Sequence, residues 1–524
     1  MAWIFDHSWY EQLRIDPNSL DAEGVPQHVS VVRTVDDAHV CAVQSSEFPQ
    51  AHLVGFNQEL AAFLGAPSLS SNSHTHKPIQ VPDQWVDWLT GKTWMDGRPP
   101  LSMVYAGHQF GQWAGQLGDG RAMHIGALIA EDNKSYALQL KGAGPTPFSR
   151  RGDGFAVLRS SIREYVASEA LYHLGIPTTR ALAIVETGHL VSRDRYYSGL
   201  IEQEPGAIVC RVSPGFIRFG HFEWFASQGA DDLLRSLADF CVARYFPECT
   251  QEEQPYLSLF KTVAERTLDL VAQWQGIGFV HGVMNTDNMS LLSETLDYGP
   301  YGFMDQYNPN WTPNTSDRPQ GRYRQGQQGQ VAIWNLMQLA NGIYPLVGKA
   351  EGFQDILAWA QDVWPQKESD VFVRKLGLPL GADQDRALVR SLLVWMERAQ
   401  VDFTDFFRKL SGIDRPEELV EDRWPTSVLD QWMAWWRDYM DRAAYWGVSD
   451  QQRQQVMKSV NPRFVPRNHH LERVIHAATQ GDWHLFHDLM RVLADPMSSE
   501  LEDPYGWALP KPMDAPDTAL SCSS

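Results

Sequence analysis

The stretch that decides the fold reads HGVMNTDN at residues 281–288 and is followed by DYG at residues 297–299. It comes after a segment whose apolar residues recur at helical spacing from Leu257 to Val271. Its amide and carboxylate oxygens are the hard ligands that a divalent ion on nucleotide phosphates prefers. The stretch therefore indicates phosphate chemistry in a loop that follows a long helix.

The spacing is similar to that of the protein-kinase catalytic loop, H-R-D-x-x-x-x-N, with D-F-G further on. Alignment on His281 places Asn288 on the metal-binding asparagine and Asp297 on the D-F-G aspartate. The catalytic aspartate would fall at Val283, which cannot accept a proton. Either the site only binds nucleotide, or another carboxylate serves. Asp287 is the nearest substitute, although an aspartate in a loop also often makes a local Asx turn.

The periodicity of the apolar residues predicts an α+β fold. Alternating segments at 124–129, 136–141, 182–185 and 208–212 predict an antiparallel sheet, and helical spacing over 157–170 predicts one helix among these strands. Amphipathic patterns predict later helices near 233–240, 257–271, 329–343, 385–398 and 429–445.

This order predicts a protein-kinase-like bilobal fold with a small β-rich N-lobe, a larger helical C-lobe, and extensions at both ends. Residues 1–100 contain Pro-, Ser- and Asn-rich breaks and are predicted to be an irregular N-terminal extension. We expect the N-lobe at 101–218, the helical C-lobe at 219–450, and a helical extension with a tail at 451–524.

A strand lysine and a helix glutamate form the first half of the predicted site. Lys141 ends a predicted strand, and Glu164 lies 23 residues later in the predicted helix. In a kinase-like lobe these two residues would face each other as an ion pair. The alternative is an ordinary surface lysine and a solvated glutamate.

Glycines and arginines supply candidate phosphate contacts, because backbone N–H groups and guanidinium groups both bind phosphate. They occur as GDGR at residues 118–121, GAG at 142–144 and RRGDG at 150–154. Arg211 and Arg218 come at the end of the sheet region, where a kinase would place its adenine-binding hinge. Two cations there suggest that the triphosphate, rather than the base, lies at this end.

Composition and net charge exclude some classes of protein. The 524 residues carry 44 Lys and Arg against 64 Asp and Glu, for a net charge of −20, which argues against a non-specific nucleic-acid binder. Residues 118–220 escape this acidity, with 12 basic and 10 acidic side chains. The start shows no signal peptide, and no run of about 18 apolar residues occurs, so we expect a cytoplasmic protein with no membrane span.

Six long motifs resemble the selenoprotein O family (SelO, YdiU in bacteria). They are YAGHQFG at 105–111, QLGDGR at 116–121, LKGAGPTPFSRRGDG at 140–154, SSIREY at 160–165, HGVMNTDNMS at 281–290 and NPRF at 461–464. Cys522 stands where selenocysteine or cysteine closes other members of the family.

The resemblance implies a pseudokinase fold that binds ATP in a reversed orientation. It implies transfer of AMP to Ser, Thr or Tyr hydroxyls of proteins, with release of pyrophosphate. Asp287 would be the proton acceptor, and Glu164 would hold Lys141. Asn288 and Asp297 would bind Mg²⁺, with Mn²⁺ as the alternative. The implied nucleotide-binding residues are Gly118, Gly120, Arg121, Lys141, Asp153, Gly154, Arg211, Arg218 and Asp297.

Three other functions remain open from the sequence. They are UMP transfer from UTP with Mn²⁺, phosphoryl transfer with Asp287 as a displaced base, and a catalytically dead nucleotide-binding scaffold. One departure from the family also matters. Some members pair the C-terminal cysteine with one in the loop after the D-F-G-like motif, but residues 298–345 contain no cysteine, so this pairing is in doubt for Cys522.

Overall fold

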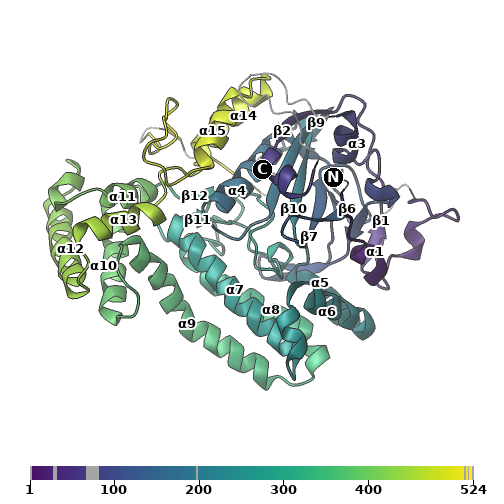
Figure 1. The fold of residues 1–524 in the computed structure, drawn as a ribbon, viewed down its shortest axis with the longest axis horizontal. Helices are drawn as coiled ribbons and strands as arrows, with labels where there is room; N and C mark the ends of the chain where they lie inside the picture. The colour runs from purple at the N-terminus through teal and green to yellow at the C-terminus, as the bar shows by residue number, and fades with distance from the viewer. Residues whose placement is uncertain are drawn as a thin grey trace.

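The computed structural model describes residues 3–27, 32–66, 82–195, 199–512, 515–516 and 518–521. Strands gather in one part of the molecule, and long helices extend from it (Figure 1). The fold is therefore α+β with an antiparallel sheet, as the apolar periodicity predicts.

Eight strands form the main sheet, in the order β1-β3-β6-β7-β10-β9-β2, with β8 also paired to β10. Their bounds are β1 Val40–Ala42, β2 His52–Phe56, β3 Leu101–Met103, β6 Ala122–Ile129, β7 Ser135–Lys141, β8 Ala156–Val157, β9 Arg180–Arg193 and β10 Glu202–Ser213. All four predicted strands are present, as β6, β7, β9 and β10.

The prediction that residues 1–100 are irregular is wrong for part of this segment. β1 and β2 occupy the two ends of the strand order. Strands of three and five residues are too short to show a clear alternation, so the sequence pattern missed them. Three short helices also lie here: α1 Ser8–Gln12, α2 Gln58–Phe63 and α3 Asp83–Leu89.

The helix predicted among the strands is α4 Leu158–His173, which packs against β9 and β10. Almost every residue from Leu158 to Leu171 is buried, because α14 and α15 cover its other side (Figure 1). The helix covers the predicted range 157–170 from Leu158 on and ends at His173, two residues before Gly175. Its burial fixes Glu164 in the interior of the molecule.

Helices dominate the chain after residue 218, as predicted. The bounds are α5 Phe219–Gln228, α6 Asp231–Tyr245, α7 Pro255–Ile277, α8 Gln328–Val347, α9 Glu351–Lys375, α10 Asp383–Ala399, α11 Phe403–Leu410, α12 Thr426–Tyr445, α13 Asp450–Val460, α14 Asn468–Thr479 and α15 His484–Leu493. The helices α7, α8 and α9 lie side by side (Figure 1).

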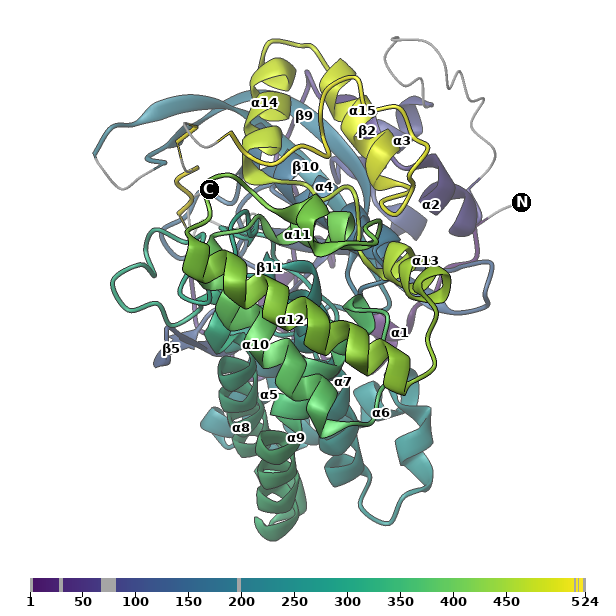
Figure 2. The same cartoon turned by 90° about the vertical axis from the view of Figure 1, so that its left-hand side faces the viewer.

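A second apolar core lies where α10 packs along α12 (Figure 2). Trp432, Trp435 and Trp436 are buried in it and stack on one another and on neighbouring rings. Their i, i+3, i+4 spacing therefore marks core packing.

Two small sheets position the loop that the sequence singles out. β11 Phe279–Val280 pairs with β12 Gly302–Phe303 and so brings the two ends of the 281–301 loop together. The hairpin of β4 Ala106–Gln109 and β5 Gln112–Gln116 packs on the same loop at its short helical turn, Thr286–Asn288.

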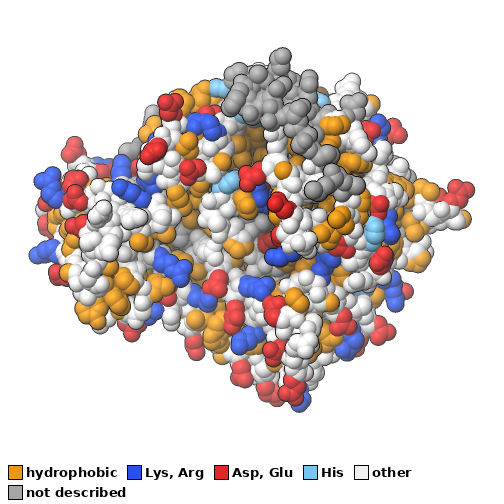
Figure 3. Space-filling model, in the orientation of Figure 1, with side chains coloured by type: hydrophobic (Ala, Val, Ile, Leu, Met, Phe, Trp, Pro, Cys, Tyr) orange, Lys and Arg blue, Asp and Glu red, His pale blue; other side chains and the backbone are white. Residues whose placement is uncertain are grey.

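The surface and the cysteines add little that is specific. Acidic and basic side chains are interspersed over the face drawn in Figure 3. Within the described ranges, no helix is long and apolar enough to cross a membrane. Cys41, Cys210, Cys241 and Cys249 are buried free thiols, and Cys522 lies outside the described residues.

Candidate active site

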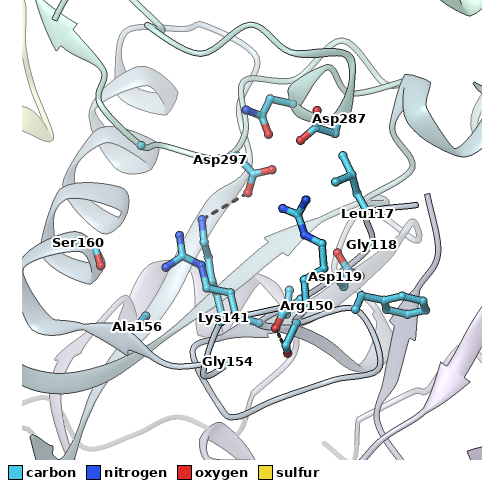
Figure 4. A pocket seen from close by; sticks show the side chains of 18 of the residues that line it. Leu117, Gly118, Asp119, Lys141, Arg150, Gly154, Ala156, Ser160, Asp287 and Asp297 are labelled. Atoms are coloured by element: carbon cyan, nitrogen blue, oxygen red, sulfur yellow. Dashed lines mark hydrogen bonds and ion pairs between the residues drawn. The ribbon is translucent and has the colours of Figure 1, made fainter. Parts of the chain in front are cut away.

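Every site residue predicted from the sequence lines one cavity of about 1130 Å³. The sheet contributes Lys141 and Arg211, α4 contributes Glu164, and the loop after α7 contributes Asp287 and Asp297 (Figure 4). The motifs are far apart in the sequence, so the fold brings them together.

The predicted ion pair is present at the inner end of this cavity. Lys141 Nζ lies 2.7 Å from Glu164 Oε2, and both side chains are buried. Lys141 also lies 3.3 Å from Asp297 Oδ1 (Figure 4). The strand, the helix and the loop thus meet through a single ammonium group.

Two arginines complete this inner charge cluster. Arg211 Nη1 lies 3.1 Å from Glu164 Oε1 and 2.7 Å from Asp297 Oδ1. Arg218 Nη1 pairs with Asp297 Oδ2 and donates a hydrogen bond of 2.7 Å to the Asp287 carbonyl. Although burial opposes it, the three cations hold the pKa of Asp297 well below its usual range.

Asp287 has the opposite environment. Its Oδ2 accepts a hydrogen bond of 3.2 Å from Gln109 Nε2, while no donor among the described residues reaches its buried Oδ1. Burial raises the pKa of Asp287 to about 6. A buried carboxylate that has few hydrogen-bond donors and a raised pKa is suited to accept a proton.

The β4–β5 hairpin holds the Asp287 loop through three successive residues. Besides Gln109, the His108 N–H donates to Thr286 Oγ1 at 2.7 Å, and the Phe110 N–H donates to Asn285 Oδ1 at 3.1 Å. The approach is close: a Cβ at Gly107 would stand 2.6 Å from Asp287 Oδ1, so only glycine fits there.

The loop around Val283 is fixed from inside. Asn288 Nδ2 donates to the Val283 carbonyl at 2.9 Å, so the amide oxygen of Asn288 is left for another partner. His281 Nε2 donates to the Leu296 carbonyl at 2.9 Å, which ties the start of the loop to the residue before Asp297. The histidine is buried, and its hydrogen bond stabilises the conformation of the loop.

The glycine-rich segments form the opposite wall. Gly118 has φ +118°, and a Cβ there would stand 2.4 Å from Phe148 Cγ, so glycine is required. The carbonyl of Gly120 accepts a hydrogen bond from the Ser149 hydroxyl, and the Gly154 carbonyl accepts one from Gly144 N–H at 3.2 Å. These contacts hold the 118–121 and 149–154 segments against each other.

The comparisons with known proteins agree with this geometry. Residues 26–494 match the family model described as protein adenylyltransferase SelO. This chain belongs to the SelO family. As a member, it is a nucleotidyltransferase that acts on proteins.

Relatives named "Protein nucleotidyltransferase YdiU" match over nearly the whole SelO-family chain. The protein of Azoarcus sp. (strain BH72) is 43% identical, with 99% of this chain and 99% of the relative covered. That of Flavobacterium johnsoniae is 41% identical, with 95% and 97% covered. That of Tolumonas auensis is 41% identical, with 100% of both chains covered.

Sequence reasoning missed three residues of this SelO-family site. Gln109 contacts Asp287 and lies in the 105–111 motif, which carried the resemblance without an assigned role. Arg193, at the end of β9, pairs with Asp153 at 2.7 Å. Buried Asp119 lines the cavity, and Gln139 Nε2 donates to it at 3.3 Å. Motif position was the available signal for Gln109 and Asp119, whereas nothing in the sequence marks Arg193.

Proposed function

We propose that this chain transfers AMP from ATP to a Ser, Thr or Tyr hydroxyl of an acceptor protein and releases pyrophosphate. The observation that carries the proposal is the pair Val283 and Asp287. A valine stands where a kinase places its base, while Asp287 places a buried carboxylate on the cavity, with no donor to its Oδ1 among the described residues. The kinase base is missing at Val283, and Asp287 supplies a carboxylate at another position. This arrangement fits the transfer of AMP rather than of the γ-phosphoryl group.

In this reaction the acceptor oxygen attacks the α-phosphorus, and its proton passes to Asp287. The new bond joins the acceptor oxygen to the α-phosphorus, and the bond from the α-phosphorus to the bridging oxygen breaks. The bonding electrons of the broken bond leave with pyrophosphate. Gln109 is the one side chain among the described residues that donates a hydrogen bond to the Asp287 carboxylate, so the carboxylate keeps the capacity to accept the proton.

We assign phosphate binding to Lys141, Arg211 and Arg218, with Gly118, Gly120, Arg121, Asp153 and Gly154 completing the nucleotide site. All of them line the cavity. Lys141, Arg211 and Arg218 are held by Glu164 or Asp297, which support their positions. Positioned cations stabilise phosphate charge without reorganising during the reaction.

Asn288 and Asp297 would hold a divalent ion, Mg²⁺ or Mn²⁺. The free amide oxygen of Asn288 and the Asp297 carboxylate are hard donors on one cavity, which fits either ion. No group of three or more His, Cys, Asp or Glu that could hold a metal occurs in the described part of the chain. Nucleotide phosphates and water would supply the remaining ligands of such an ion. When bound, it would neutralise phosphate charge.

For the fold, we propose the kinase-like bilobal arrangement, divided near residue 218. The main sheet with α4 would be the small lobe, and the helices from α5 onward the larger one. The position of the cavity supports this division, because its lining comes from both sets of elements. The further divisions at residues 100 and 450 stay predictions.

Labelled nucleotides test the reaction. The protein is incubated with divalent metal, protein acceptor and ATP labelled at the α- or γ-phosphate, with α-labelled UTP in parallel. We expect label on protein from α-labelled ATP only, and none with the Asp287→Asn variant. Transfer from γ-labelled ATP alone would identify a kinase. A stronger signal from UTP would identify a uridylyltransferase, and no transfer in any arm would identify a scaffold.

A further inference from the structure

The cations that line the cavity fall into two groups. Lys141, Arg211 and Arg218 pair with Asp297, and Arg193 pairs with Asp153. By contrast, Arg121, Arg150 and Arg151 line the cavity without an ion pair to any residue in the described ranges, and Arg150 is exposed. A free guanidinium in a phosphate site is available to a ligand.

The backbone of Arg150 is held in an unusual conformation. Its φ of +53° lies in the left-handed region, which costs a non-glycine residue free energy. It occupies a tight turn closed by the Gly152 N–H, which donates to the Ser149 carbonyl at 2.7 Å. Glycine would adopt this conformation at lower cost, so an arginine here indicates a use for the side chain.

Anchoring contacts keep this turn in place. The Thr146 N–H donates to Ser149 Oγ at 2.8 Å, and the Ser149 hydroxyl donates to the Gly120 carbonyl. The turn that carries Arg150 is thereby fixed to the glycine-rich wall next to Gly118. A fixed base gives the side chain a defined reach into the cavity.

Figure 4 shows the direction of that reach. The Arg150 side chain rises from the wall into the cavity, toward the side on which Asp287 and Asp297 lie. Lys141 and Asp297 meet on that side through their ion pair. The guanidinium thus points to the region where the acceptor hydroxyl, next to Asp287, would meet the nucleotide.

We propose that Arg150 is a phosphate-binding residue of the transfer reaction, and that its guanidinium binds the α-phosphate as pyrophosphate departs. The assignment of the α-phosphate rests on the proposed function. Planar guanidinium groups bind two phosphate oxygens at once and stabilise the charge that develops during transfer. The paired cations keep the inner site in shape, and Arg150 supplies a donor that is not already engaged.

Two variants of Arg150 test this role. Arg150→Ala removes the guanidinium and keeps the strained φ, whereas Arg150→Gly removes the guanidinium and relieves the strain. We expect both to lower turnover by roughly 10- to 100-fold, the usual range for a charged hydrogen bond. The Gly variant should melt at the higher temperature, which separates the loss of activity from instability.

Arg151 provides the matched control, because it is also exposed on the cavity and carries the same charge. The loss of turnover for Arg151→Gly should be several-fold smaller than that for Arg150→Gly. Added guanidinium ions should restore part of the activity of Arg150→Gly and none for Arg151→Gly. Turnover of Arg150→Gly within threefold of wild type, or equal losses at both positions, would overturn the proposal.

Ligand binding separates this proposal from the proposed function. Arg150→Gly should weaken ATP binding about tenfold in calorimetry and leave adenosine binding unchanged. If the wild type transfers no nucleotide to protein, the proposed function fails, yet the difference between ATP and adenosine still decides whether Arg150 binds phosphate. Unchanged ATP binding together with full transfer activity would contradict the role of Arg150 alone.

Discussion

Buried carboxylates on different walls of one cavity differ in their ion-pair partners. On the inner wall, Asp297 contacts Lys141, Arg211 and Arg218. On the other walls, Asp119 and Asp287 form no ion pair with any described residue, and each keeps one buried oxygen without a donor. On the inner wall the charged groups pair with one another, whereas these two oxygens have no hydrogen-bond donor among the described residues.

The pKa values follow this division. The cations hold the pKa of Asp297 well below its usual range against the effect of burial. Burial raises the pKa of Asp119 and of Asp287 to about 6 in each case. Mutations at these aspartates should therefore separate stability from activity.

The largest effect is expected for Asp297→Ala. It leaves Lys141 and Arg211 with Glu164 as their remaining carboxylate partner, and Arg218 without an ion pair to any described residue. Breaking a buried charge network of this kind costs about 3–5 kcal/mol, and nucleotide transfer should be lost as well. Urea unfolding and an α-label transfer assay measure the two effects. A variant as stable as wild type would show that the cations do not depend on Asp297.

Asp287→Asn should break activity and leave stability intact. The amide keeps an oxygen for the hydrogen bond from Gln109 but cannot take a proton, so transfer should fall about 10²- to 10⁴-fold. At neutral pH the free energy of unfolding should not fall below that of wild type, because no ion pair is removed and a buried carboxylate with a raised pKa is replaced by a neutral amide. If Asp287→Asn were as unstable as Asp297→Ala, the contrast between the two walls would be wrong.

The inner wall was largely predictable from the sequence. Lys141 ends an alternating strand and Glu164 lies on the buried stripe of a helix, so local periodicity and spacing place both. The positions of Asn288 and Asp297 followed from one loop pattern whose ends β11 and β12 hold together. Patterns of this kind involve residues close together in the chain, so they can be recognised from the sequence alone.

The other walls depended on contacts between distant segments. The hairpin that touches Asp287 lies 178 residues away from it in the sequence, and Arg193 reaches Asp153 across 40 residues. The edge strands β1 and β2 are three and five residues long. Neither periodicity nor motif spacing reports such pairings, since they depend on how the sheet closes.

The smallest effect, and the finest test of the comparison, concerns Asp119. Its folded-state pKa of about 6 exceeds the ordinary value of 3.8, so the folded protein binds the proton more tightly than the unfolded chain. The contribution of Asp119 to wild-type stability should therefore fall as the pH rises from 3.8 to about 6, by at most about 3 kcal/mol.

Asp119→Asn should remove this dependence. The amide oxygen can accept the hydrogen bonds from Met103 N–H and Gln139 Nε2, and its NH₂ replaces the oxygen that has no partner. The variant should therefore be more stable than wild type above about pH 6, and the difference should shrink toward pH 4. Urea unfolding of both proteins across this range measures it. An Asp119→Asn variant that is less stable than wild type at neutral pH, with a deficit that shrinks on acidification, would mean that Asp119 is stabilised as an anion, like Asp297, and that the two walls do not differ in the way their contacts indicate.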